Sequence, residues 1–208
     1  MQNTLELHRR AAAAVHPVLD RVTTADLDLP TPCTGWDLRA LLAHMTGQDH
    51  GFAAAVRAAR GGEDVDVAAF HPRPLGATPA TTLSAGLDDV VAAFAEAGDL
   101  EAPVLLPEFG ARPPLHVVAG MHLVDTLVHG WDVAATLGVH ADYSAGLADD
   151  LAAATLALSE QVPDDASREA PGAPFGRALP ADPDADDWTR TLTLLGREPS
   201  WRPQPART

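Results

Sequence analysis

One stretch of the chain, residues 123–138, reads LVDTLVHGWDVAATLG and combines an apolar sequence with acids and imidazoles. At the 100° per residue of an α-helix, His122, Asp125, His129 and Asp132 fall within an arc of about 80°. Buried carboxylates and imidazoles cost several kcal/mol each unless they are paired or coordinated. A divalent cation would satisfy two imidazoles and a carboxylate together, so this face is a candidate metal site.

The alternative is that this face is the solvent side of an amphipathic helix, as in most helical bundles. Solvent faces usually mix Lys, Arg, Glu and Asp, whereas this one holds only His and Asp. The opposite side, with Leu123, Gly130, Ala134 and Leu137, is not polar either. The pattern therefore favours a central helix whose polar stripe lies inside the protein.

Three residues are the candidate ligands. Asp125 and His129 lie four residues apart, which puts them on adjacent turns about 5–6 Å apart at Cβ, a span suited to chelation. A third ligand must come from another helix, and His44 in LRALLAHMTGQ is the best candidate because it flanks a core stripe. The alternative for His44 is a satisfied core or surface histidine. Gln48, one turn further on, either reaches the open site or is a solvated helix residue.

Other side chains have a weaker claim to the site. His122 or Asp132 could orient a ligand imidazole by a hydrogen bond to its second ring nitrogen. The alternative for Asp132 is an acid on the surface of the helix. Cys33 is either a nucleophile near a helix N-terminus, where its pKa would fall, or a small buried hydrophobe. Trp36 and Trp131 are interpreted as packing residues rather than substrate platforms. The remaining histidines are interpreted as surface or structural: His8, His16, His50, His71, His116 and His140.

Helical periodicity predicts the elements that must position these residues. The expected helices cover residues 4–22 (interrupted by Pro17), 35–60 (with Thr34 and Asp37 as a capping box), 79–95, 116–137, 144–161 and a short last helix within 184–196. Residues 61–78 and 162–184 are expected to be loops, and 101–115 either an irregular loop or a small hairpin. Four long helices and few plausible strands predict an all-α protein, an up-down four-helix bundle with additional C-terminal helices. We expect one domain over residues 1–208, with the bundle at about 4–138 and a helical extension at 139–208.

Composition restricts the classes of function. The chain has 208 residues, 46% of them hydrophobic, and a formal net charge of −15. A phosphate backbone requires a basic stripe, so nucleic-acid binding is not expected. We expect neither a transmembrane helix nor a signal peptide, because there is no run of eighteen apolar residues and no apolar segment at the N-terminus. The single Cys33 cannot form an internal disulfide, and a cytoplasmic location is expected.

Two segments, TPCTGWDLRALLAHMTGQDHGFAAAVRA and HLVDTLVHGWDVAATLG, resemble the DinB-like superfamily. Within it, they are similar to the N-terminal domain of mycothiol-dependent maleylpyruvate isomerase. The closing FGRALP and DWTRTLTLLGREPSW resemble an actinobacterial branch of that group, so the likeness spans nearly the whole chain. The absence of lysine and the abundance of alanine indicate a GC-rich source, which agrees with that branch.

The resemblance implies a four-helix bundle that binds a divalent metal through one His on the second helix and an acid and a His four apart on the fourth. Carried over, the ligands are His44, Asp125 and His129. The isomerases carry Glu at the acidic position, so Asp125 departs from the pattern by one methylene. About seventy residues follow the fourth helix, too few for the isomerase C-terminal domain, so maleylpyruvate does not transfer as substrate.

Three functions are compatible with such a site. The preferred one is a metal-dependent transferase or isomerase that uses a thiol, mycothiol by resemblance, on a small electrophilic metabolite. The second is a metal-dependent hydrolase or lyase acting through metal-bound water, and the third is a non-catalytic metal-binding protein. Zinc is the first expectation for the metal, and the ligand set also suits iron or nickel. The expected partner is a small-molecule substrate, and a homodimer is possible.

Overall fold

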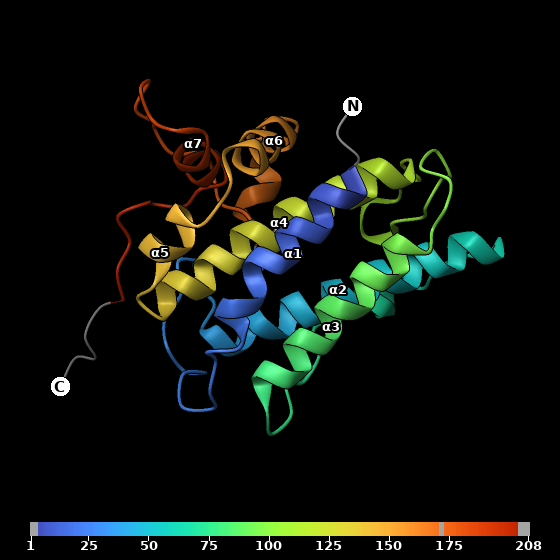
Figure 1. Cartoon of the computed structure of the whole chain (residues 1–208), viewed down its shortest axis with the longest axis horizontal. Helices are drawn as coiled ribbons and strands as arrows, with labels where there is room; N and C mark the ends of the chain where they lie inside the picture. The colour runs from blue at the N-terminus through green and yellow to red at the C-terminus, as the bar shows by residue number, and fades with distance from the viewer. Residues whose placement is uncertain (1–3, 171–172, 204–208) are drawn as a thin grey trace. The chain divides into compact units, whose positions relative to one another are not determined.

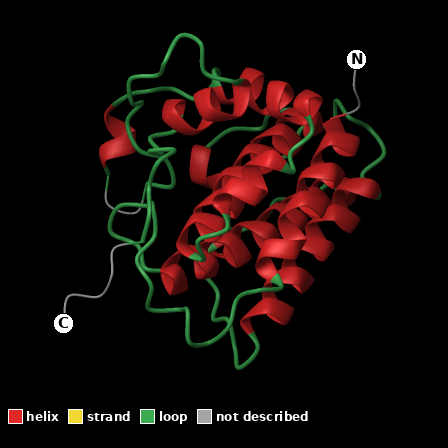
Figure 2. Cartoon of the chain, turned by 60° about the vertical axis from the view of Figure 1, so that its left-hand side comes forward, coloured by secondary structure: helices red, strands yellow, loops and turns green. Residues whose placement is uncertain are grey.

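The computed structural model describes residues 4–170 and 173–203, and these contain helices and loops but no β-strand (Figures 1 and 2). The all-α prediction is confirmed. No helix in the described part of the chain has the length and apolar character that a membrane span requires. The α-helices are α1 (Thr4–Leu19), α2 (Leu38–Gly61), α3 (Pro79–Ala95), α4 (Leu115–Thr136), α5 (His140–Ala145), α6 (Asp149–Ser159) and α7 (Asp187–Leu194).

Two compact units make up the chain. The first comprises Met1–Thr24 and Leu42–Leu127, and the second comprises Ala25–Leu41 and Val128–Thr208. Helices α2 and α4 each contribute residues to both units, and α4 is unbroken where it passes from one to the other. The expectation of a single domain over the whole chain stays a prediction.

In the first unit, α1 packs against α3 (Figure 1). The buried residues of the two helices include Leu7, Ala11 and Val15 of α1 and Leu87 and Val90 of α3. These positions recur every three or four residues, so each helix turns one apolar stripe inward. Pro17 does not break α1 in its middle, since the helix continues to Leu19 and ends two residues beyond the proline.

Two glycines on α2 let a loop segment approach its backbone. A Cβ at Gly47 would lie 2.6 Å from the carbonyl oxygen of His71, and one at Gly51 would overlap the ring of Phe70. Residues 67–70 form a short 3-10 helix, so the predicted loop after α2 packs closely on this glycine face. The spacing of four residues puts both glycines on one side of the helix.

Helix α2 begins at Leu38, three residues later than expected. Gly35 has a φ of 84°, a left-handed conformation that cannot start a right-handed helix. Asp37 accepts a hydrogen bond from the Ala40 amide at 2.8 Å, so Asp37 caps the helix N-terminus. The predicted capping box that begins at Thr34 is wrong for this reason.

In the second unit, α6 packs against α7. The single helix expected over residues 144–161 is instead divided into α5 and α6, because the chain leaves the helix at Gly146 and re-enters it at Asp149. In the described part of residues 162–184, which leaves out 171–172, the 3-10 helix Ala166–Glu169 is the only helical segment. The chain after it is fixed to the end of α7 by backbone hydrogen bonds, from Leu179 to Thr193 at 2.8 Å among them.

The segment 101–115 forms the small hairpin, one of the two alternatives. Antiparallel bridges join Pro103 to Pro114 and Leu106 to Ala111. Backbone hydrogen bonds from Val104 to Pro113 at 3.0 Å and from Leu106 to Ala111 at 2.9 Å hold it. Its end leads directly into α4, which carries the polar face.

Candidate metal centre

The polar face of α4 is inside the protein. His122, His129 and Asp132 are fully buried, and the side chain of Asp125 is 16% exposed. The apolar residues on either side of them, such as Val124 and Val128, are buried too. The predicted internal stripe is confirmed, and the solvent-face alternative is wrong.

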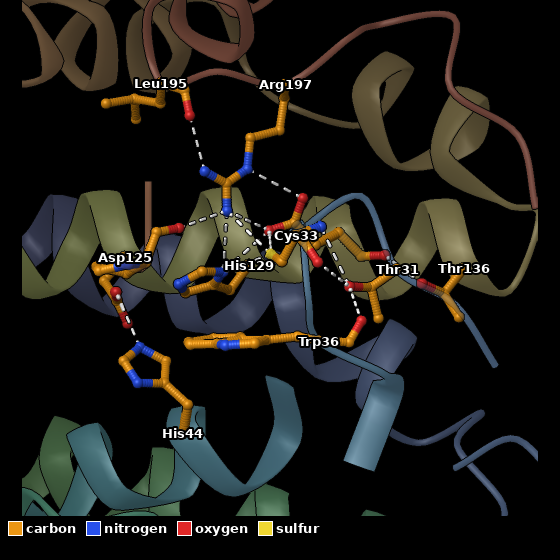
Figure 3. Close-up of polar contacts among 11 residues, drawn as sticks. Thr31, Cys33, Trp36, His44, Asp125, His129, Thr136, Leu195 and Arg197 are labelled. Carbon is orange, nitrogen blue, oxygen red and sulfur yellow. Dashed lines mark hydrogen bonds and ion pairs between the residues drawn. The ribbon is translucent and has the colours of Figure 1, made fainter. Parts of the chain in front are cut away.

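Within the first unit, His44 and Asp125 lie close together. His44 Nε2 is 3.7 Å from Asp125 Oδ1, and Figure 3 shows the two polar groups facing each other from α2 and α4. The distance is too long for a hydrogen bond. Two ligands that each lie 2.0–2.2 Å from one tetrahedral ion are about 3.4 Å apart, so the separation suits shared coordination. Both side chains are about one-sixth exposed, which leaves the pair accessible to a small molecule.

His129 lies one turn beyond Asp125 on the unbroken helix α4. Its Nδ1 is 2.9 Å from Asp132 Oδ2. An ionised carboxylate only accepts hydrogen bonds, so Nδ1 carries the proton and Nε2 is the nitrogen through which His129 would bind a metal. Carboxylate–histidine pairs of this kind support metal ligands in many proteins.

Two aromatic rings fix the plane of the His129 imidazole. Trp36 stacks on it with ring centroids 6.2 Å apart, and Phe175 does so at 5.7 Å with an interplanar angle of 16°. Figure 3 shows the Trp36 ring alongside the imidazole. Trp36 therefore packs as expected, and so does Trp131, which is 1% exposed and lies edge-on to His140.

Asp132 is held by a guanidinium that the sequence did not single out. Arg197 donates from Nε to Oδ1 at 3.2 Å and from Nη2 to Oδ2 at 2.8 Å. Burial alone would raise the pKa of Asp132, but Arg197 and the hydrogen bond from His129 outweigh it, and the pKa falls below its usual range. Asp132 is thus a buried anion rather than the surface acid of the alternative interpretation.

Cys33 contacts the same carboxylate. Its Sγ donates to Asp132 Oδ2 at 3.0 Å and accepts from Arg197 Nη2 at 3.1 Å. Burial raises the pKa of the Cys33 thiol, and the charge of Asp132 raises it further. Cys33 is therefore a protonated, buried thiol, which opposes the nucleophile hypothesis.

Within the second unit, Cys33, His129 and Asp132 form a group of three side chains that could hold a metal ion. This group does not fit a metal, because Arg197 already binds both Cys33 and Asp132. His44 and Asp125 of the first unit, with His129 one turn further along α4, offer two imidazoles and one carboxylate, which is the donor chemistry of a catalytic site.

His122 is engaged elsewhere in the first unit. Its Nε2 is 3.1 Å from Asp49 Oδ1, and its Nδ1 is 2.8 Å from His8 Nε2 and 3.1 Å from the Thr126 hydroxyl. These contacts do not link it to a candidate ligand. Gln48 is buried and donates to Glu108 at 3.4 Å. A role for either residue at the metal stays a prediction.

Sequence reasoning missed Arg197, Phe175, Asp49 and His8. For Asp49 a signal existed, because it lies four residues after Met45 and so shares a face of α2 with it. No local spacing indicates that Arg197 reaches Asp132, since 65 residues separate the two. Its only sequence signal was its place in the closing motif LLGREPSW.

Residues 8–134 match the mycothiol maleylpyruvate isomerase N-terminal domain family. The chain belongs to this family. Two Mycobacterium tuberculosis proteins, named uncharacterized protein Rv0738 and uncharacterized protein MT0763, are each 30% identical to it over 199 residues, which is 93% of this chain and 97% of theirs. The family membership and the DinB-like resemblance are thus shown.

Two solved structures share the fold. The crystal structure of the mycothiol-dependent maleylpyruvate isomerase is 17% identical, with a TM-score of 0.51, and that of a mutant of this enzyme is 16% identical, with a TM-score of 0.53. Each comparison covers 62% of this chain and 59% of the isomerase chain. The family match ends at residue 134, so Phe175 and Arg197 lie beyond it.

Proposed function

We propose that this protein is a divalent-metal-dependent transferase or isomerase. Its cosubstrate is a thiol, mycothiol, and its substrate is a small electrophilic metabolite. The observation that carries the proposal is the His44–Asp125 pair, 3.7 Å apart and partly exposed, in a member of this family. His129, one turn from Asp125 on the same helix, is the proposed third ligand.

The donor set supports a catalytic rather than a structural metal. Three protein ligands leave further coordination positions open, whereas structural zinc sites are closed by four. A divalent metal bound there would act as a Lewis acid that lowers the pKa of a thiol, so that thiolate is available at neutral pH. Zinc is the proposed metal, and the two-imidazole, one-carboxylate set also accepts iron or nickel.

The chain's own residues have distinct tasks in this proposal. Asp125 would supply the anionic ligand, and its side chain is one methylene shorter than the Glu that the resemblance implies for the isomerases. Asp132 holds the proton on Nδ1 of His129 and thereby keeps Nε2 for coordination. The partial exposure of His44 and Asp125 admits the thiol and the electrophile.

The test is a thiol-conjugation and isomerisation assay with mycothiol, run on protein loaded with zinc and on protein stripped by a chelator. The expected result is turnover that requires both zinc and thiol and that is lost in His44→Ala and Asp125→Asn. Asp88→Asn is the matched control, because Asp88 forms a surface pair with His16 at 3.1 Å in the same unit and should leave activity unchanged. Metal-dependent turnover without thiol would overturn the thiol role, and metal-independent turnover would overturn the proposal.

A further inference from the structure

We propose that Arg197 is a positioning residue of the metal centre. Acting through Asp132, it fixes the tautomer and orientation of His129, and it keeps Asp132 and Cys33 from serving as competing metal ligands. This inference rests on the proposed function, since it concerns the same centre. Arg197 lies beyond residue 134, where the family match ends, so the inference gives the C-terminal segment a role in supporting the metal centre.

The guanidinium is fully committed to protein acceptors. Besides Asp132, it donates from Nη1 to the Leu195 carbonyl at 2.8 Å, and from Nη2 to the Pro174 carbonyl at 2.8 Å and to Cys33 at 3.1 Å. Arg197 is 2% exposed. Its donors therefore point at buried groups around His129 rather than at solvent, and Nη2 itself lies 3.5 Å from His129 Nδ1 (Figure 3).

The carboxylate of Asp132 joins the guanidinium to the imidazole. One oxygen, Oδ2, lies 2.9 Å from Nδ1 of His129 and 2.8 Å from Nη2 of Arg197. The fork geometry of arginine binds both carboxylate oxygens and so holds the plane of the carboxylate. A carboxylate with a fixed plane fixes the direction of the bond from Nδ1, and with it the direction of Nε2.

The same contacts suppress a second metal site. Cys33, His129 and Asp132 form a ligand group of their own, with a soft sulfur and a carboxylate. Arg197 occupies both the sulfur and the carboxylate, so a metal cannot bind there without displacing it. Without the guanidinium, His129 would face two competing ligands at its Nδ1 side.

The backbone around Arg197 is built to hold it in place. The preceding residue, Gly196, has a φ of 80°, and a Cβ there would lie 2.7 Å from Gly176 Cα. Only glycine allows this close approach of the two segments. The amide of Arg197 also donates to the Leu192 carbonyl at 2.8 Å. A side chain fixed in this way suits a supporting role, which depends on a rigid frame.

The first test reads the His129 tautomer in the full-length, metal-free protein by ¹H–¹⁵N correlation spectra of the imidazoles, assigned by the signal lost in His129→Gln. The expected result is protonated Nδ1 in the parent and a shifted or mixed tautomer in Arg197→Met. Arg197→Lys keeps the buried charge but lacks the fork, so it should be intermediate, and it replaces the Met variant if that variant does not fold. A parent with protonated Nε2, or an unchanged tautomer in both variants, would overturn the proposal.

Arg168→Met is the matched control. Arg168 is also buried in the second unit, and its guanidinium donates to the carbonyls of Val162, Pro163, Gly176 and Leu194. It should loosen the same segment without altering the His129 tautomer. A change in the control equal to that in Arg197→Met would reduce Arg197 to a structural residue and overturn the proposal.

The second test measures Co²⁺ binding by chelator competition and absorption. Arg197→Met should bind about 10- to 100-fold more weakly than the parent, as losses of supporting contacts do, or gain a thiolate-to-cobalt band that Cys33→Ser removes. Unchanged affinity and spectrum would contradict the inference. A parent that binds no Co²⁺ or Zn²⁺ would instead refute the proposed function, and the tautomer measurement would still decide the role of Arg197.

Discussion

Each unit contains a buried histidine–carboxylate pair whose histidine lies on α4, and the two pairs differ in which groups bind the carboxylate. His122 pairs with Asp49 at 3.1 Å and His129 with Asp132 at 2.9 Å. Asp132 is also bound by Arg197. In the described part of the chain, no guanidinium is hydrogen bonded to Asp49.

This difference shifts the pKa values of the two carboxylates in opposite directions. Burial raises the pKa of Asp49 despite the hydrogen bond from His122, whereas Arg197 lowers the pKa of Asp132 against a comparable burial. Both ring nitrogens of His122 are engaged by neighbours in the core. The same pair of residue types thus packs in the core of one unit and, in the proposed metal centre, supports a ligand in the other, and the buried guanidinium distinguishes the two.

The largest expected effect is on the pair that has the guanidinium. Asp132→Asn leaves Arg197 buried without its counter-charge, and breaking a buried ion pair from one side costs about 3–5 kcal/mol. Urea unfolding at neutral pH should show this loss in the free energy of unfolding. A loss below about 1 kcal/mol would mean that Arg197 does not depend on Asp132.

The next largest effect is expected on zinc affinity, which should differ between variants of Asp125 and Asp49. Asp125→Asn replaces a proposed anionic ligand by a neutral one. Zinc affinity should therefore fall by about 10- to 100-fold or more, since the loss of a supporting contact alone costs that much. Asp49→Asn, in the other pair, should leave zinc affinity unchanged. Chelator titration of both variants checks this, and equal affinities would remove Asp125 from the ligand set.

The first pair should respond to acid through His8. Burial lowers the pKa of His8 well below its usual value, and the neighbouring His122 lowers it further. Because the unfolded chain binds the proton more tightly, the stability that neutral His8 contributes is complete above about pH 6.5 and is lost as the pH falls below that value toward the folded pKa. The groups facing His8 are His122 and, behind it, Asp49.

His8→Gln should therefore flatten the dependence of unfolding free energy on pH between about pH 7 and pH 5. Denaturant titrations across this range compare it with the parent. Identical slopes in the parent and His8→Gln would show that the core tolerates a charged His8.

The smallest effect is expected for Asp49→Asn. Its raised pKa means that folding favours the protonated acid, so the stability present below about pH 3.8 is lost as the pH rises through the folded pKa. A neutral amide can still accept the hydrogen bond from His122 without the desolvation of a charge. The variant should cost less than about 1 kcal/mol in urea unfolding at neutral pH. A cost equal to that of Asp132→Asn would erase the contrast between the pairs.

The sequence predicted most of what depends on local periodicity. The 100° repeat predicted that α4 is buried and that its ionisable residues share one face. The core stripe of α2 singled out His44, which lies 3.7 Å from Asp125. Helix ends were less accurate, because the start of α2 depends on the left-handed Gly35 and the division into α5 and α6 depends on Gly146.

What the sequence did not predict depends on contacts between distant residues. Arg197 lies 65 residues from Asp132, and His8 lies 114 residues from His122, so no helical spacing relates either pair. Composition does not reveal them either, since arginine is mostly exposed and histidine is only intermediate in burial. Only the tertiary structure shows that these partners satisfy the buried polar groups of α4.

The most direct test of the metal centre is elemental analysis of the purified protein beside its His129→Ala variant. The variant removes one proposed ligand, while the ion pair of Asp132 with Arg197 still keeps the surrounding charges balanced. The account predicts about one transition metal ion per chain in the parent and very little in the variant. Equal metal content in the two proteins would contradict it.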